Sequence, residues 1–250
     1  MTYDTLSART ALVTGAASGM GAATAALLAA HGARVALLAR REDRLTELAG
    51  RIGGRALPVT ADVTDDESVA AAVRRIHDTY GRIDLAVNSA GVMLPNPVTD
   101  GRQDEWTRML DTNVSGTLRV VRAVTPDLLS AAADGGPADL VNISSIGAHT
   151  VFPAYAVYSA TKAAVTQLSA SLRAELGPRN VRVTNIEPGL TATELGDHID
   201  NDGLTAQLGG MFETLDALTA EDVADLVAYT TSRPRRVNLR QTVILPTGQA

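Results

Sequence analysis

Two side chains that could move a proton lie four residues apart in the second half of the chain. These are Tyr158 and Lys162. Lys162 is the only lysine of the chain, so all the other residues in its total of 22 Lys and Arg are arginine. On a helix, residues four positions apart lie on one face, which would place the phenol beside the ammonium. A neighbouring cation favours the phenolate and lowers a phenol pKa that starts near ~10. The pair is a candidate general acid and base; a surface lysine next to a core tyrosine is the alternative interpretation.

The single lysine is informative because the chain uses arginine at every other basic position. An ammonium is a compact point charge on a thin stem, whereas a guanidinium is planar, bulky and always charged. A position that keeps lysine in such a chain is expected to need the smaller cation. We therefore expect Lys162 to lie where a guanidinium would not serve.

A glycine-rich segment near the amino terminus could hold phosphates. Residues 14–21 read Thr-Gly-Ala-Ala-Ser-Gly-Met-Gly, after an apolar run at 11–13 and directly before a helix-like stretch at 22–30. Gly15, Gly19 and Gly21 would permit a tight turn and a close approach of the backbone to a pyrophosphate. The helix that follows offers free N–H groups and the positive end of its dipole to that anion. The context predicts dinucleotide binding, and a purely structural turn is the alternative.

Two further positions concern the adenosine half of such a dinucleotide. The second apolar run ends in Ala39, followed by Arg40 and Arg41, where a carboxylate would otherwise accept the 2′-hydroxyl of NAD. A neutral end followed by two arginines favours a 2′-phosphate and hence NADP, although the arginines could also merely solvate a helix start. Asp62 could accept a hydrogen bond from the adenine amine or cap the next helix.

Short apolar runs alternate with helix-like stretches for most of the length. Continuous apolar runs are typical of parallel strands buried on both faces, and repeated strand–helix alternation implies right-handed crossovers. The sequence thus predicts an α/β fold, a doubly wound (Rossmann) single domain over residues 1–250 with a mainly parallel seven-stranded sheet. The expected strands are at 11–13, 35–39, 57–63, 85–87, 140–143, 181–186 and 243–245, and clear helical stretches are at 42–52, 66–80 and 104–129.

One segment does not follow this pattern. Residues 190–216 are rich in Gly, Asp and Thr and have weak periodicity, so we expect a long loop there. Such a loop in a compact domain is usually a lid or a binding loop, or else disordered. We expect it to form the substrate pocket together with residues 93–97 and 146–155.

Composition excludes several classes of function. A formal net charge of −6 argues against a nucleic-acid partner, because phosphate binding needs a concentrated basic surface. The absence of cysteine excludes disulfides and thiolate chemistry. His149 and His198 lack further ligands in sequence, so no metal site is expected. The first residues lack signal-peptide features and no apolar stretch is long enough to span a bilayer, which predicts a cytoplasmic protein without a membrane partner.

Taken together, these residues resemble the classical short-chain dehydrogenase/reductase family along essentially the whole chain. Its Thr-Gly-x-x-x-Gly-x-Gly loop matches residues 14–21, and its Tyr-x-x-x-Lys matches Tyr158 and Lys162. The serine that the family places thirteen residues before the tyrosine corresponds to Ser145. Its helix asparagine corresponds to Asn113, and its turn after the sixth strand to Pro188-Gly189.

The resemblance implies roles for these residues. Ser145 would polarise a substrate carbonyl, Tyr158 would supply the proton, and Lys162 would lower the Tyr158 pKa and hold the nicotinamide ribose. Asn113 would anchor a water that relays protons to Lys162. Ser144 is a rival for Ser145 because neighbouring strand residues point to opposite faces, and Tyr155 is a rival for Tyr158 without a cation four residues later.

The resemblance also implies a cofactor site and a reaction. One departure is Asn88-Ser89-Ala90-Gly91, where the family has Asn-Asn-Ala-Gly. The implied activity is hydride transfer between NADP(H) and a small ketone, aldehyde or hydroxy acid, and in cells the protein would act as a ketoreductase. The resemblance also implies a homo-oligomer, either a dimer or a tetramer. A non-catalytic dinucleotide-binding sensor or scaffold is the alternative. The cofactor-binding residues expected are Gly15, Ser18, Gly19, Met20, Gly21, Arg40, Arg41, Asp62, Val63, Asn88, Ala90, Gly91, Tyr158, Lys162, Pro188, Gly189, Thr191 and Thr193.

Overall fold

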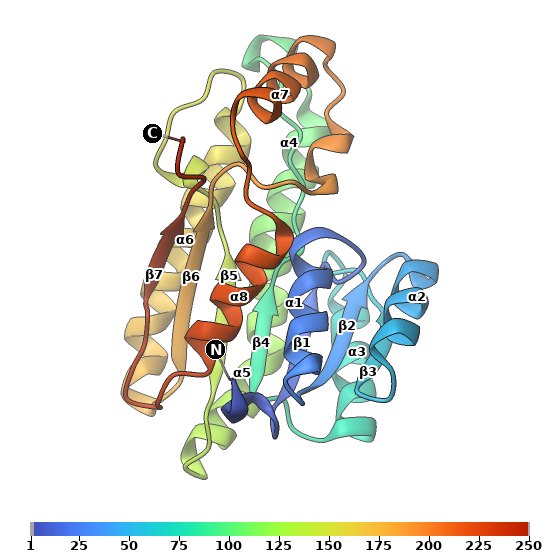
Figure 1. Cartoon of the computed structure of the whole chain (residues 1–250), viewed down its shortest axis with the longest axis vertical. Helices are drawn as coiled ribbons and strands as arrows, with labels where there is room; N and C mark the ends of the chain where they lie inside the picture. Colours follow the sequence, from blue (N-terminus) through green and yellow to red (C-terminus); the bar gives the residue numbers. More distant parts are fainter. Residues whose placement is uncertain (1–2, 250) are drawn as a thin grey trace.

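Parallel strands and helices alternate along the chain in the computed structural model, which describes residues 3–249 (Figure 1). All strand pairs of the seven-stranded sheet are parallel, in the order β3-β2-β1-β4-β5-β6-β7. The prediction of a doubly wound Rossmann-type domain with seven strands is therefore confirmed. The strands are β1 Thr10–Thr14, β2 Arg34–Ala39, β3 Ala56–Thr60, β4 Leu85–Asn88, β5 Asp139–Ile143, β6 Arg182–Pro188 and β7 Gln241–Ile244.

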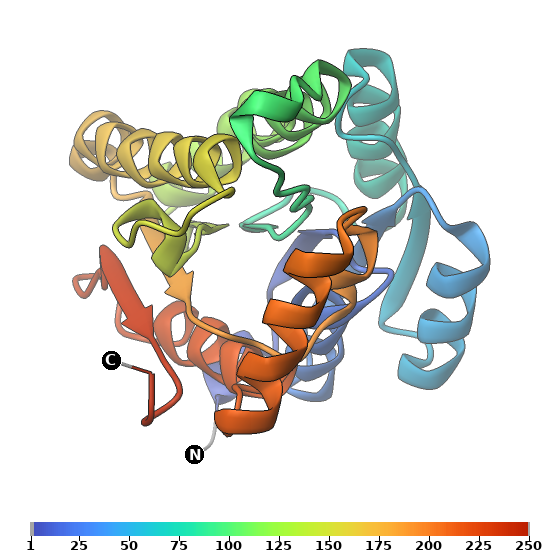
Figure 2. The ribbon, with the colours of Figure 1, turned by 90° about the horizontal axis from the view of Figure 1, so that it is seen from above.

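Helices cover both faces of the sheet (Figure 2). On one face lie α3 Asp66–Tyr80, α5 Thr117–Ala133 and α6 Ala156–Leu176. On the other lie α1 Gly19–Ala30, α2 Glu42–Ile52 and α8 Ala220–Thr231. The crossovers between parallel strands place successive helices on these faces, so the loops after the strands gather at one edge of the sheet.

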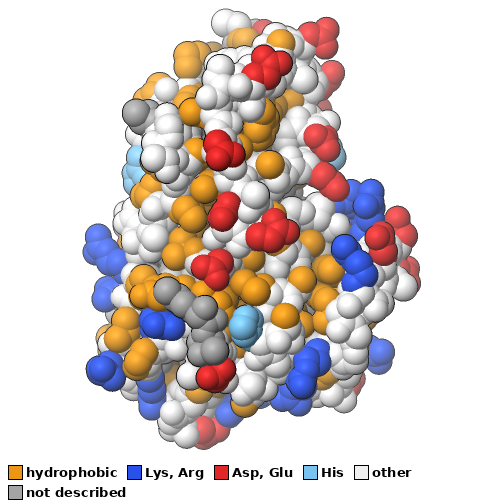
Figure 3. All heavy atoms as spheres, in the orientation of Figure 1, with side chains coloured by type: hydrophobic (Ala, Val, Ile, Leu, Met, Phe, Trp, Pro, Cys, Tyr) orange, Lys and Arg blue, Asp and Glu red, His pale blue; other side chains and the backbone are white. Residues whose placement is uncertain are grey.

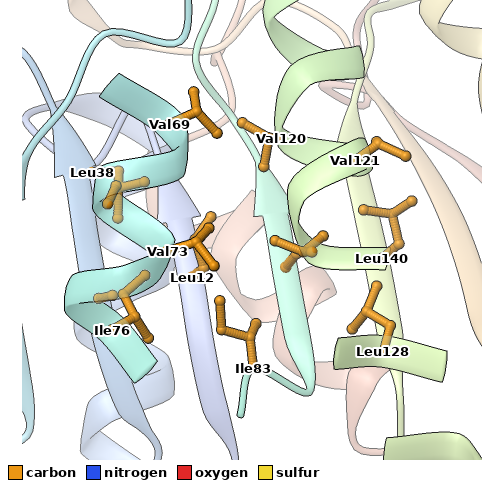
Figure 4. Packing of buried hydrophobic residues seen from close by; sticks show 14 of the residues in the cluster. Leu12, Leu38, Val69, Val73, Ile76, Ile83, Val120, Val121, Leu128 and Leu140 are labelled. Atoms are coloured by element: carbon orange, nitrogen blue, oxygen red, sulfur yellow. The ribbon is translucent and has the colours of Figure 1, made fainter. Parts of the chain in front are cut away.

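The continuous apolar runs reflect a core on each side of the sheet. In β1, Leu12 packs into the cluster under α3 and α5, whereas Ala11 and Val13 pack into the cluster under α1 and α8. Figure 4 shows the first cluster, in which Val73 and Ile76 of α3 lie close to strand residues. The inner strands β1, β4, β5 and β6 are buried at every position, so no alternation appears in them, whereas the edge strands β3 and β7 alternate in burial.

The helix expected at 104–129 is interrupted. The chain forms α4 Gln103–Met109, a π-helical segment Leu110–Gly116 and then α5. The Asn113 side chain accepts from the Val92 N–H and donates to the Val92 carbonyl, both at 2.9 Å. A π-helical turn inserts one extra residue, and such turns are frequent at functional sites.

The segment at 190–216 is mostly helical, which corrects the expectation of a loop. It contains a 3-10 helix, η6 Glu194–His198, and α7 Asp202–Thr214, whose first turn is capped by the Asn201 side chain accepting from Leu204 N–H at 3.1 Å. None of the α7 residues is fully buried; Leu204, Leu208 and Met211 lie on one face of the helix and are only partly buried. Figure 1 shows α7 beyond the carboxyl ends of the strands. Within residues 3–249, no helix is long and apolar enough to cross a membrane.

Candidate active site

The turn between β1 and α1 requires glycine at two positions. Gly15 has a φ of +68°, and a Cβ on it would lie 2.9 Å from the backbone of Ala90. A Cβ on Gly21 would lie 2.4 Å from the Gly15 carbonyl oxygen. The Thr14 hydroxyl accepts from the N–H groups of Ser89 and Ala90, both at 3.1 Å, which ties this turn to the end of β4. The glycine turn is thus packed directly against the loop after β4.

A cavity of about 250 Å³ lies over the start of α1. Ser18 is the N-cap residue, yet its side chain makes no cap hydrogen bond, and the first turn of α1 has no acidic residue. The first-turn N–H groups and the helix dipole are therefore available to an anion. These backbone N–H donors at the start of the helix fit the pyrophosphate of a dinucleotide.

Arg40 and Arg41 line the far end of this cavity. Arg41 donates to the Ser18 hydroxyl at 2.9 Å and to the Glu194 carboxylate at 3.0 Å. The hydrogen bond from Arg41 is the main reason why the pKa of Glu194 lies below its usual range. Glu194 belongs to η6, so this ion pair joins the end of β2 to the segment that carries α7.

Asp62 and Val63 line the same cavity, two and three residues after β3 ends at Thr60. Burial would raise the pKa of Asp62, but hydrogen bonds from the backbone and hydroxyl of Thr64 and the nearby Arg40 hold it low. The capping alternative for Asp62 is wrong: Asp65 caps α3, accepting from the N–H groups of Glu67 and Ser68.

Tyr158 and Lys162 lie on the inner face of α6 and are 6% and 7% exposed. The Lys162 Nζ donates to the Ile143 carbonyl at 3.0 Å and lies 5.8 Å from the centroid of the Tyr158 ring. A Cβ on Gly91 would lie 3.6 Å from this Nζ, so the loop after β4 approaches the ammonium closely. The alternative of a surface lysine is thereby excluded.

Burial sets the ionisation of this pair. Loss of water raises the pKa of Tyr158 to about 12, against a hydrogen bond with Ser145 that lowers it. The same loss of water lowers the pKa of Lys162 to about 8. The expectation that Lys162 depresses the Tyr158 pKa is therefore not met, because loss of water is the dominant cause of the shift and the ammonium lies over the ring.

The structure distinguishes Ser145 from Ser144 and Tyr158 from Tyr155. The Ser144 hydroxyl donates to the Lys162 carbonyl at 2.8 Å and shares a hydrogen bond with Thr166, so it holds β5 to α6. Ser145 accepts from the Gly147 N–H at 3.0 Å and hydrogen-bonds Tyr158. Tyr155 lies edge-on to Tyr158 with 6.4 Å between ring centroids. Ser145 and Tyr158 are the hydroxyls that face each other.

Asn113 lies in the π-helical segment, behind Lys162. Besides its two hydrogen bonds to Val92, its side chain donates to the Thr161 hydroxyl at 3.0 Å. A Cβ on Gly91 would be 3.3 Å from the Asn113 Oδ1. Asn113 thus connects the loop after β4 to α6 at the level of Lys162, and its side-chain amide is fully engaged.

A second cavity, of about 380 Å³, opens next to the first. Ser145 and Tyr158 line it, whereas Lys162 lines the first, and Met20, Thr193 and Leu195 line both. Residues of η6 and α7 form much of its wall, together with Gln249, whose Oε1 accepts from the Leu190 N–H at 2.9 Å. The prediction that the 190–216 segment contributes pocket walls agrees with this lining; of the other two expected stretches, 146–155 contributes several residues and 93–97 contributes Met93.

The expected cofactor residues divide between the cavities. Pro188, Gly189 and Thr191 line only the second cavity, and Thr193 lines both. Asn88 lines neither, and its side chain donates to Asn142 at 2.9 Å. The other expected residues that line the first cavity are Gly15, Ser18, Gly19, Met20, Gly21, Arg40, Arg41, Asp62, Val63, Ala90, Gly91 and Lys162.

The first cavity also has lining residues that the sequence motifs did not identify as cofactor contacts. These include Ser89, Thr112, Ile143, Leu195 and His198.

Neither histidine of the mouth region belongs to a metal cluster. His149 pairs with the buried Glu187 at 3.0 Å, and His198 lines the first cavity. In the described part of the chain, no group of three or more His, Cys, Asp or Glu side chains could hold a metal ion.

Comparisons with known proteins agree on one family. A sequence profile described as short chain dehydrogenase matches residues 9–203. The chain is 37% identical over 242 residues to sulfoacetaldehyde reductase 2 of Chromohalobacter salexigens, covering 96% of this chain and 94% of that protein. The closed form of serine dehydrogenase complexed with NADP+ has a TM-score of 0.89 and 31% identity over 96% of both chains. The 3-ketoacyl-(acyl-carrier-protein) reductase from Brucella melitensis, complexed with NADH, has a TM-score of 0.87 and 28% identity, covering 96% of this chain and 98% of that one.

Proposed function

The chain belongs to the short-chain dehydrogenase family, and from that membership we propose a specific activity for it. It is an oxidoreductase that acts on CH–OH or carbonyl groups with a nicotinamide dinucleotide. We propose that its cofactor is NADP(H), that its substrate is a small ketone, aldehyde or hydroxy acid, and that in the cell it works as a ketoreductase. The proposal about direction and cofactor goes beyond family membership and rests on the residues below.

One observation carries the proposal: Ser145 and Tyr158 line the wider cavity, while Lys162, behind them, lines the narrow one. A substrate in the wider cavity would meet two hydroxyls, and a dinucleotide along the glycine turn would end beside the ammonium. This junction is where a hydride donor and a carbonyl must meet. When bound, the nicotinamide supplies the hydride.

The residues divide the remaining chemistry between them. Ser145 would donate a hydrogen bond to the carbonyl oxygen and polarise it. Tyr158, with a pKa raised to about 12 by burial, is fully protonated near neutral pH and can deliver its proton to that oxygen. Lys162 would hold a ribose hydroxyl and favour the phenolate that remains after proton transfer.

Asn113 is proposed as a positioning residue with a water-relay role. Because its side-chain amide is engaged with Val92 and Thr161, a relay water would have to bind its backbone carbonyl, which also accepts from Thr117 at 2.8 Å. We propose that a water leading to Lys162 binds this carbonyl beside the Thr117 hydroxyl.

NADP is preferred over NAD in this proposal because of the charges at the end of β2. Ala39 offers no carboxylate to a 2′-hydroxyl, and Arg40 and Arg41 offer planar donors suited to a phosphate. Glu194 competes for Arg41, which should moderate the preference. Among the similar structures, one is complexed with NADP+ and another with NADH, so the arginines carry this part of the argument.

A proposal about assembly and location follows from the surface. Leu110 and Leu118, on the outer side of the α4–α5 region, are 49% and 43% exposed. Exposed apolar side chains about two turns apart on one helical run can contribute to association, and we propose a dimer or tetramer. Sedimentation measures the assembly. We propose the cytoplasm as its location, which cell fractionation tests.

The experiment for the activity is direct. The pure protein is mixed with NADPH or NADH and a panel of ketones, aldehydes and hydroxy acids, and the loss or gain of reduced nicotinamide is followed. We expect NADPH-dependent reduction. Cofactor binding without turnover of any substrate would instead support a non-catalytic sensor or scaffold, although Ser145, Tyr158 and Lys162 are all present.

A further inference from the structure

The wall of the second cavity is built almost entirely from uncharged side chains. Leu208, Met211 and Phe212 of α7 face it from one side, and Phe152, Leu190 and Ile199 contribute from the loops. The polar lining away from the Ser145–Tyr158 pair is neutral, from threonines and from Gln207 and Gln249. Among the described lining residues there is no Lys, Arg or His, and Asp197, exposed at the rim, is the one group that is charged at neutral pH.

The basic side chains near this wall already have partners. The Lys162 ammonium donates to the Ile143 carbonyl and lines the other cavity. His149 pairs with Glu187, and Arg102 pairs with both Glu105 and Asp200. Figure 3 shows no blue side chain around α7 on the visible face, where hydrophobic and acidic side chains gather.

A carboxylate or sulfonate in this cavity would therefore lose water without gaining a counterion. Removal of an ionised group from water is costly unless it is paired, and here the one charged neighbour has the same sign. An uncharged substrate has no such cost and gains from contact with the apolar wall.

We propose that the substrate is an uncharged, largely apolar ketone or aldehyde, and that carboxylates and sulfonates are excluded by the wall. This proposal rests on the proposed carbonyl reduction and narrows it, removing the free hydroxy acids. The carbonyl carbon gains the hydride of NADPH and its oxygen gains the proton of Tyr158, so that an alcohol and NADP+ are left.

Three related β-keto compounds test the charge and the apolar character of the substrate. Acetoacetate and acetoacetamide have nearly the same shape and differ in charge, and ethyl acetoacetate is neutral and longer. With NADPH, kcat/KM for the amide should exceed that for the acid by roughly ten- to a hundredfold, the usual consequence of an unpaired buried charge. The ester should exceed the amide by up to about fourfold for each additional buried methylene. An acid that is reduced as well as the amide would overturn the proposal.

A matched pair of variants locates the effect in the wall. Phe212 is 39% exposed, so a polar residue there should leave the fold intact. Phe212→Arg should raise kcat/KM for acetoacetate by about tenfold while lowering it for the ester, whereas Phe212→Gln should lower it for the ester without helping the acid. Equal effects of the two substitutions on the acid would contradict the assignment.

Binding separates this proposal from the proposed function. The same three compounds are titrated into the protein saturated with NADP+, and the shift in melting temperature is measured. If the amide and ester bind but are not reduced, the proposed reductase activity is wrong and the wall assignment stands. If the acid is reduced as well as the amide, the reductase activity stands and the wall assignment is wrong; if the acid binds best and nothing is reduced, both are wrong. If none is reduced or bound, both are wrong.

Discussion

The ammonium of Lys162 lies 5.8 Å from the centroid of the Tyr158 ring and donates its hydrogen bond to the Ile143 carbonyl. Both side chains are almost completely buried, and burial moves their pKa values apart, with Tyr158 raised to about 12 and Lys162 lowered to about 8. Near neutral pH the phenol is therefore a proton donor and the ammonium is the more acidic group of the two. This ordering suits reduction, in which the phenol gives its proton to a carbonyl oxygen.

Tyr158→Phe should lower kcat by roughly 10²–10⁴-fold, because the substitution removes the proton donor and leaves the packing of the ring. Binding of NADPH should change little, since the glycine turn and the arginines are untouched. Steady-state rates and a fluorescence titration with NADPH measure the two effects.

Tyr155→Phe is the matched control for this substitution. Tyr155 lies edge-on to Tyr158 and is only partly buried. Its phenol should be dispensable for proton transfer, so kcat should stay within a few-fold of wild type. If Tyr155→Phe were inactive and Tyr158→Phe active, the proton would come from Tyr155.

Lys162→Arg should be nearly as damaging as Lys162→Met, although it keeps the charge. The Nζ donates to the Ile143 carbonyl, and a Cβ placed on Gly91 would lie in contact with the Nζ, at 3.6 Å. A planar guanidinium needs more room and donates in a different direction. Comparison of kcat/KM for the two variants checks this, and an arginine variant with wild-type activity would show that any cation serves.

Stability as a function of pH tests the burial of Lys162 without any substrate. Its pKa is lowered from 10.5 to about 8 in the folded protein. Below pH ~8 Lys162 is charged in both the folded and the unfolded protein, and the folded protein carries the cost of burying that charge. Between pH ~8 and ~10.5 Lys162 is protonated only in the unfolded protein. The free energy of unfolding therefore rises with pH across this window. Relative to Lys162→Met, wild type should gain on the order of 3 kcal/mol across this window.

Urea unfolding of the cofactor-free protein at a series of pH values measures that gain. Tyr158→Phe is the control, because the pKa of Tyr158 is raised from 10.0 to about 12 and the difference from wild type should stay flat up to pH ~10. A constant difference between wild type and Lys162→Met would mean that Lys162 keeps an ordinary pKa.

How far the sequence could predict this site differs between its parts. The glycine turn, Tyr158 and Lys162 could be located because local spacing determines their geometry: a helix brings positions four apart together, and a turn before a helix exposes its N–H groups. Parallel strands could be recognised because burial on both faces removes alternation.

Other parts depend on contacts between distant residues. The pairing of Arg41 with Glu194 joins positions 153 apart, and no local pattern encodes it. Helix α7 has no fully buried residue, and its short apolar stripe of Leu204, Leu208 and Met211 is surrounded by glycine and polar residues, so the pattern typical of a helix is weak there. The π-helical segment at Asn113 arises from hydrogen bonds to Val92, 21 residues away. The local sequence gives no physical reason to prefer Ser145 over Ser144. The structure gives one, because the Ser144 hydroxyl is occupied by its hydrogen bond to the Lys162 carbonyl.

Gly21→Ala should destabilise the protein and abolish NADPH binding, because the new Cβ would lie 2.4 Å from the Gly15 carbonyl oxygen. Gly50→Ala is the matched control: Gly50 is exposed in α2, and a Cβ there meets nothing within 4 Å. Alanine in a helix interior is favoured over glycine by about 1 kcal/mol, so this variant should be slightly more stable. Thermal unfolding and NADPH titration separate the two cases, and a Gly21→Ala protein that binds NADPH normally would contradict the packing argument.

Arg40→Ala with Arg41→Ala should raise the KM for NADPH by roughly ten- to a hundredfold and barely change that for NADH, because charge-assisted hydrogen bonds to a phosphate contribute about 1.5–3 kcal/mol each in favourable geometry. Adding Ala39→Asp should then favour NADH by accepting from its free 2′-hydroxyl. The ratio of kcat/KM for the two cofactors is the measurement. A wild type that prefers NADH, or a ratio that the double substitution leaves unchanged, would end the NADP assignment.

Glu194→Gln tests the competition for Arg41 and should act in the opposite direction. The pair is 46% and 44% exposed, so the interaction is worth about 1 kcal/mol at most. Its removal frees Arg41 for the 2′-phosphate and takes a negative charge away from that end of the cavity, which should lower the KM for NADPH by up to about fivefold and leave NADH unaffected. Because salt screens exposed charges, the gain should shrink at high ionic strength. Glu213→Gln, exposed on α7, is the control and should change neither cofactor. If Glu194→Gln weakened NADPH binding, the carboxylate would instead be holding Arg41 in place for the phosphate.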